Sequence, residues 1–206
     1  MDVKSLKKKK VPGLVIRARE HTVTLGMFCL FFVGIISGAL MIRLENPISS
    51  LIVSMFRQYN GLIVANGFIK NFAELFFSNV FFVLVLFFLG FSAIGSPFVC
   101  IISFVKGVGI GIVSSYLYNN YMLSGFGYCM LIFFPQQIIN MLALFIAMNE
   151  SFVNSKMIFK TIGGTNQNEF DLKIYSQRYF FVFILEVISS LLGSVLNTYL
   201  SPVFIK

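Results

Sequence analysis

Five uninterrupted apolar runs occupy most of this 206-residue chain. Each run is about 20 residues or longer, which at about 1.5 Å rise per residue is enough to cross the ~30 Å hydrocarbon layer of a bilayer. A soluble domain could not cover the apolar perimeters of five such helices. The sequence therefore predicts an all-α integral membrane protein, a bundle of five transmembrane helices at residues 23–42, 72–91, 97–118, 123–148 and 179–200.

Charged residues are few, and many of them precede the first run. Apolar residues make up 57% of the chain and charged residues 12%, against about 45–50% and about 25% in an average soluble domain. The net charge of +8 would also suit a nucleic-acid-binding protein. A basic tail beside a transmembrane helix instead fixes topology and contacts anionic lipid. We therefore expect membrane lipid as a partner and no nucleic acid. The tail contains Lys4, Lys7, Lys8, Lys9, Lys10, Arg17 and Arg19.

The distribution of positive charge predicts the orientation of the chain. A cytoplasmic N-terminus places eleven Lys and Arg residues in the inner segments and four in the outer ones, as the positive-inside rule requires. The C-terminus is then extracytoplasmic. We predict a basic cytoplasmic tail at 1–22 and a single transmembrane domain at 23–206. This domain has an amphipathic outer loop at 43–71 and a flexible inner loop at 149–178.

The outer loop carries an apolar pattern of its own. Its spacing is close to the i, i+3, i+4, i+7 repeat of one helical face, at Leu51, Ile52, Met55 and Phe56. One interpretation is a short helix on the outer membrane surface or over the bundle. The other is a docking surface for an extracytoplasmic partner.

Polar side chains on three different spans share one predicted depth. A charge inside a span costs about 2.5–3.5 kcal/mol on insertion scales, and we assign two to the predicted spans, Lys106 and Glu186. Counted from the inner ends of their spans, Lys106, Glu186 and Asn140 lie roughly 10–13 Å deep. We predict a structural ion pair with the amide beside it. Snorkelling of Lys106 to the inner interface and a proton or ion relay are the alternatives.

The fourth run contains a proline near its middle. Pro135 removes one backbone hydrogen bond, so the helix is expected to kink there. The neighbouring Gln136 and Gln137 could satisfy the freed carbonyls or bond to adjacent helices.

Small residues indicate where two helices approach closely. The pair Gly34 and Gly38 forms a small-x-x-x-small face in the first run, and Gly107 and Gly111 thin the third. Packing is their expected role.

Motifs for catalysis, cofactors and metals were sought without success. The single histidine, His21, has no second imidazole for a metal site or a triad. We expect no enzymatic activity, no cofactor, no metal and no small-molecule substrate.

Several short motifs in the middle of the chain resemble the stage II sporulation protein M family. They are LGFSAIGSP at 89–97, FVKG at 104–107 with Gly111, GFG at 125–127, and FFPQQ at 133–137 with Asn140. The resemblance rests on sequence motifs within residues 86–150, and in the rest of the chain on the arrangement of the predicted spans. It implies a non-enzymatic membrane scaffold for endospore formation, which anchors and localises peptidoglycan-degrading partners during forespore engulfment. The implied partners are stage II sporulation proteins D and P. The implied location is the bacterial cell membrane, on the mother-cell side of the sporulation septum.

A second class of function stays open at this point. A permease-like subunit of a transport system would need a hydrated path past Lys106, Glu186 and Gln136, whereas a scaffold would need a partner-binding outer loop.

Overall fold

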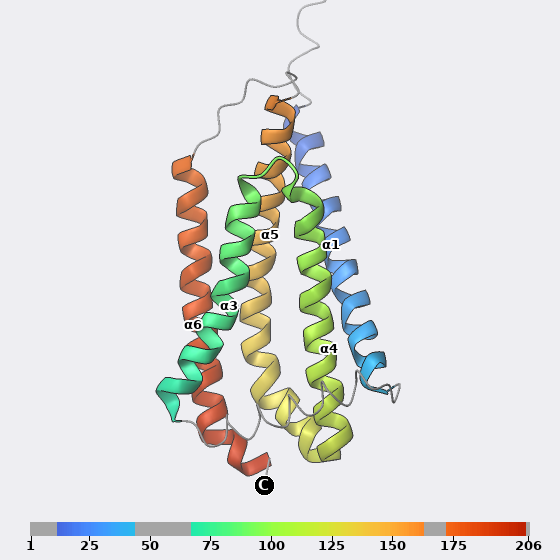
Figure 1. Ribbon diagram of the computed structural model, residues 1–206, viewed down its shortest axis with the longest axis vertical. Helices are drawn as coiled ribbons and strands as arrows, with labels where there is room; N and C mark the ends of the chain where they lie inside the picture. The colour runs from blue at the N-terminus through green and yellow to red at the C-terminus, as the bar shows by residue number, and fades with distance from the viewer. Residues whose placement is uncertain (1–11, 44–66, 163–171, 205–206) are drawn as a thin grey trace, which may run out of the picture.

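The computed structural model describes residues 12–43, 67–162 and 172–204, with side chains from 23 to 200 within these ranges. Every regular element in these ranges is helical, which confirms the all-α fold class. In chain order the elements are α1 (Pro12–Arg43), α3 (Phe68–Gly90), α4 (Gly95–Tyr128), the π-helical η2 (Cys129–Phe133), α5 (Phe134–Ile162) and α6 (Leu172–Phe204). The helices form one elongated bundle (Figure 1).

Four helical stretches in the described ranges are long and apolar enough to cross a membrane, which supports a multi-pass membrane protein. They are Val23–Arg43, Phe68–Gly90, Gly95–Ile162 and Leu172–Leu200. This count is four rather than the predicted five because the expected spans at 97–118 and 123–148 fall in one continuous stretch of 68 residues. Within that stretch α4 and α5 run side by side in opposite directions (Figure 1).

Several helices extend beyond the predicted spans. The first begins at Pro12, inside the segment expected to be a tail, and α5 continues to Ile162. Together with the start of α6 at Leu172, this makes much of the predicted inner loop at 149–178 helical. Buried serines explain the extension of α5, because Ser151 and Ser155 pack against α3 and the start of α4.

Met122 interrupts the helical backbone between the two arms of the long stretch. Its φ is 48° and its ψ is −121°, and it is the one non-glycine residue with positive φ among those described. An L side chain in such a region costs of the order of 1–3 kcal/mol, whereas glycine adopts it freely. The chain therefore makes a strained turn at Met122, where the helical stretch Gly95–Ile162 reverses its direction.

We expect Met122→Gly to stabilise the protein. Removing the side chain relieves the steric conflict, and the gain of about 1 kcal/mol should raise Tm by about 2–4 °C. Met122→Val should lower Tm, because a β-branched side chain tolerates positive φ least. Thermal unfolding of the purified variants measures both changes. If Met122→Gly were less stable than the wild type, the strain at this turn would be disproved.

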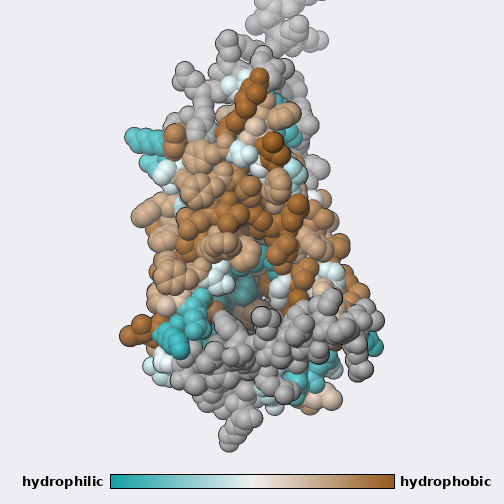
Figure 2. Space-filling view, in the orientation of Figure 1, coloured by the Kyte–Doolittle hydropathy of each residue, from teal (hydrophilic) through white to brown (hydrophobic). Residues whose placement is uncertain are grey.

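The outside of the bundle is apolar, as a lipid-facing surface should be. Figure 2 shows a broad hydrophobic band across this face of the molecule. Large side chains such as Phe77, Phe81 and Leu123 are 71%, 62% and 87% exposed. Because these residues have no packing role inside, lipid is the solvent that suits them.

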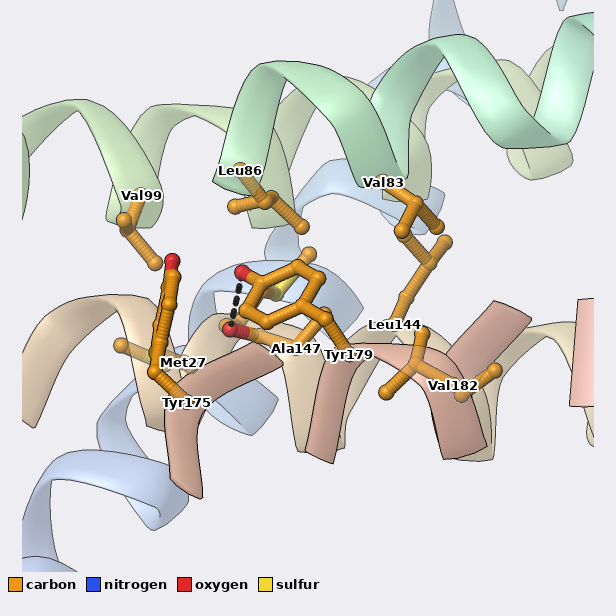
Figure 3. Packing of buried hydrophobic residues seen from close by; sticks show 11 residues of the cluster. Met27, Val83, Leu86, Val99, Leu144, Ala147, Tyr175, Tyr179 and Val182 are labelled. Atoms are coloured by element: carbon orange, nitrogen blue, oxygen red, sulfur yellow. Dashed lines mark hydrogen bonds between the residues drawn. The ribbon is translucent and has the colours of Figure 1, made fainter. Parts of the chain in front are cut away.

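The main apolar core lies toward the end of the bundle where α3 passes into α4. Val83 and Leu86 of α3, Val99 of α4, Leu144 of α5 and Val182 of α6 meet there, each at most 4% exposed (Figure 3). Side chains of α3, α4, α5 and α6 thus pack together in this layer.

A set of tyrosine and serine hydroxyls fixes the same end of the bundle. Tyr179 donates to the Ala147 carbonyl at 3.1 Å, drawn as a dashed line in Figure 3, and also bonds to the Ser151 hydroxyl. Tyr175 donates to the Phe87 carbonyl at 2.9 Å. These bonds tie α6 to α5 and to the last turn of α3.

Helices α1 and α4 approach closely enough for their backbones to touch. A Cβ added to Gly34 would meet the Phe104 carbonyl oxygen, and one added to Gly38 would meet that of Val108. On the facing helix, Gly107 and Gly111 lie against the Phe31 and Ile35 carbonyl oxygens. The four glycines predicted for helix packing therefore lie in one interface.

Serine hydroxyls also join pairs of helices, and these bonds were not predicted from the sequence. Each donates to a backbone carbonyl of another helix at 3.0 Å or less. The bonds are Ser103 to Met27 at 2.8 Å, Ser151 to Leu86 at 2.7 Å, Ser189 to Gln136 at 3.0 Å and Ser194 to Phe68 at 2.8 Å. In an apolar environment such bonds hold helices together without a hydrophobic driving force.

Candidate functional site

A buried carboxylate and a buried amide form the centre of the polar interior. The Asn140 side-chain nitrogen donates to Glu186 Oε2 at 2.8 Å, and both residues are fully buried. Glu186 Oε1 and Asn140 Oδ1 have no hydrogen-bond partner within the described ranges. The arrangement places a carboxylate between α5 and α6 with a single bond to hold it.

Lys106 takes a position that differs from the predicted ion pair. Its Nζ lies 4.1 Å from the centre of the Phe82 ring on α3. A salt bridge joins Arg178 to Glu150, but among the described residues none joins Lys106 to Glu186. Glu186 instead faces Asn140 between α5 and α6, while Lys106 turns toward Phe82 of α3.

Lys106 also lines a cavity between α3, α4, α5 and α6. The cavity has a volume of about 760 Å³. Figure 2 shows hydrophilic residues in a hollow on this face, below the hydrophobic band. The polar lining residues are Glu74, Ser78, Asn79, Lys106, Tyr128, Gln136, Gln137 and Asn197, and the remainder are apolar or glycine.

The predicted glutamines are both part of this lining. Gln136 is 3% exposed and its side chain lies against Gly193 of α6, where any Cβ would collide with it. The Tyr128 hydroxyl donates to the side-chain oxygen of Asn197, and both residues line the cavity. Polar groups from four helices thus face one space.

The sequence analysis missed part of this site. Glu74 is a third charge within the predicted span 72–91, so the count of two charges in spans was wrong. Asn79 and Asn197 are single amides in apolar runs, 6% and 5% exposed, and were not considered. Asn79, like Asn140, is an amide inside an apolar run. A comparison of the depths of all polar residues in the runs would have drawn attention to it.

The cavity ends against the apolar core. Along α3 the lining stops at Phe82 and the core begins at Val83, and along α4 the core residue Val99 precedes the first lining residue, Val105. The cavity and the core therefore occupy successive levels of the bundle.

A change of helix type lies beside Pro135, the residue at which a kink was predicted. The π-helical η2, Cys129–Phe133, directly precedes α5, and Pro135 is the second residue of α5. Proline cannot donate to the carbonyl four residues earlier, and π-turns occur where that pattern is broken. This change presents Gln136 and Gln137 to the cavity.

Two other expectations concern binding sites. The candidate partner-binding residues Leu51, Ile52, Met55 and Phe56 lie outside the described residues. In the part of the chain that the structure describes, no three His, Cys, Asp or Glu side chains gather as a possible metal site.

Long apolar helices around a polar interior define a multi-pass helical membrane protein. Comparison with known families narrows this class. The family model described as stage II sporulation protein M matches residues 27–202, and the chain belongs to that family. No curated protein and no solved structure matches the chain.

Proposed function

We propose that the protein is a membrane scaffold for endospore formation, without enzymatic activity of its own. In this role it anchors and localises peptidoglycan-degrading partners during forespore engulfment, and stage II sporulation proteins D and P are the proposed partners. It acts from the mother-cell side of the sporulation septum. The observation that carries the proposal is the family match over residues 27–202, which includes nearly all of the described helices.

The proposed topology has five crossings. The reversal at Met122 divides Gly95–Ile162 into two antiparallel arms, and each arm is longer than the ~20 residues that a crossing needs. Together with α1, α3 and α6, the two arms make five crossings, which is an odd number. Positive charge favours a cytoplasmic N-terminus and hence an extracytoplasmic C-terminus.

Cysteine accessibility should separate the two sides. In a variant with Cys29, Cys100 and Cys129 changed to alanine, we expect Asn119→Cys to react with a membrane-impermeant maleimide in intact cells. Ser92→Cys, in the α3–α4 turn, should react only after the membrane is opened. Both positions are exposed in the structure, so a difference in labelling reports the side of the membrane. Labelling of both cysteines in intact cells would contradict five crossings.

Affinity purification from sporulating cells tests the scaffold role. The wild-type protein should co-purify with the two proposed partners. The double variant Leu51→Asp and Phe56→Asp should insert normally but release them, if the outer loop docks them. A matched double variant at lipid-facing positions, Phe77→Leu and Phe81→Leu, should keep them. Absence of both partners from the wild-type preparation would refute the scaffold.

A permease-like subunit is the second candidate, and the polar cavity favours it. The apolar core weighs against it. Its packed side chains, among them Val83 and Val99, block a continuous path from the cavity to the other end of the bundle. Reconstituted vesicles distinguish the two, since a transport subunit should accelerate the release of a trapped solute and a scaffold should not.

A further inference from the structure

An unused hydrogen-bond donor in the cavity is the starting observation. Asn79 is 6% exposed, lines the cavity, and its side-chain nitrogen has no partner within the described ranges. A buried donor without a partner costs about 1–3 kcal/mol, so something that accepts a hydrogen bond is expected there. A native structure rarely leaves such a group without a water or a ligand.

The chemistry of the lining indicates what could bind. Four of the lining residues are carboxamides: Asn79, Gln136, Gln137 and Asn197. A carboxamide both donates and accepts hydrogen bonds, whereas an anion needs donors alone and a cation needs acceptors alone. A group with hydroxyls or amides has the same dual character and matches this lining.

The charges in the cavity agree with an uncharged ligand. The lining has one ammonium, Lys106, and one carboxylate, Glu74, so its formal charges balance. They lie on different helices, and counting from the α3–α4 turn separates them by roughly 8 Å along the bundle. The described lining therefore has no net charge that would favour an anion or a cation.

Size and surroundings also fit a sugar. The volume of about 760 Å³ lies within the usual range of small-molecule sites, about 300–1,000 Å³. Phe82 and Phe133 add aromatic side chains to the lining beside the polar groups. We propose that this cavity binds a neutral sugar group, presented either on a lipid or free in solution. This inference does not depend on the scaffold function.

Thermal unfolding of the full-length protein in phosphatidylcholine nanodiscs tests the site. We expect monoglucosyl diacylglycerol, at a concentration about 100-fold above its Kd, to raise Tm by about 5 °C or more. Diacylglycerol without the sugar should have no effect. N-acetylglucosamine in solution forms a second arm. A shift with the glycolipid alone identifies a lipid-linked sugar, and a shift with both probes identifies the sugar itself as sufficient.

Two variants and a control connect the shift to the cavity. Asn79→Leu and Gln137→Leu should abolish it, and Asn79→Leu should still fold because it removes a donor without a partner. Asn149→Leu is the matched control, since Asn149 lies in the middle of α5, bonds to Thr24 and does not line the cavity. A rise in Tm in the cavity variants equal to that of the wild-type protein would overturn the proposal. So would no shift with either sugar probe, or a shift with phosphatidylglycerol that depends on Lys106.

Discussion

Gly38→Val is expected to prevent accumulation of the folded protein. A Cβ at this position would meet the Val108 carbonyl oxygen, and the Val108 Cα and carbonyl carbon lie 3.0 Å away. These are backbone atoms in the middle of a helix and cannot turn aside, so α1 and α4 would have to separate. Overpacking usually costs about 1–3 kcal/mol, and a clash with backbone should lie at or above the upper end. Accumulation in membranes and SDS-induced unfolding of the purified protein measure the loss.

Gly26→Val is the matched control for this change. It is on the same helix, and a Cβ there has no heavy atom within 4 Å. We expect a near-wild-type unfolding midpoint for it. Equal losses for Gly26→Val and Gly38→Val would show that flexibility of α1, and not its contact with α4, explains the effect.

Asn140→Leu should be the second severe substitution. It removes the one hydrogen bond that the described residues give to the fully buried Glu186, and leaves the carboxylate in an apolar space. Removing one partner of a buried charged hydrogen bond costs about 3–5 kcal/mol, much of it from the group left behind. SDS-induced unfolding of the purified variant measures this loss.

The double variant Asn140→Leu and Glu186→Met provides the sharper test. Replacing both partners with apolar residues removes the stranded charge, so most of the lost stability should return. If the losses of stability in the two single variants add up to the loss in the double variant, the bond between Asn140 and Glu186 contributes no coupling energy. Lys106→Met should change stability less than Asn140→Leu, because Lys106 is half-buried at the cavity and makes no direct ion pair.

The fold class and several site residues followed from the sequence for a common reason. Length and apolarity suffice to identify helices that cross a membrane, because the bilayer requires both. The Gly34 and Gly38 face was recognisable because a small-x-x-x-small spacing allows close approach of backbones. The level shared by Asn140 and Glu186 followed from helix rise alone.

Other features depended on how the helices are rotated, which helix rise does not determine. Depth placed Lys106 beside Glu186, but rotation of α4 directs its ammonium to Phe82 instead. Met122 is not a glycine, so its residue type does not predict the positive φ found there. The serine bonds were missed because serine is unremarkable in an apolar run until a carbonyl of another helix lies opposite.

Those serine bonds have a consequence for how this bundle tolerates mutation. Each acceptor is a main-chain carbonyl, at positions such as Met27, Leu86 and Phe68. Every amino acid carries the same carbonyl, so the residue on the accepting helix can be exchanged without loss of the bond. The donor has no such freedom, because its hydroxyl belongs to the side chain. Substitutions can therefore accumulate on one side of each contact while the serine opposite is constrained, and chains with little sequence in common can keep the same helix pairing.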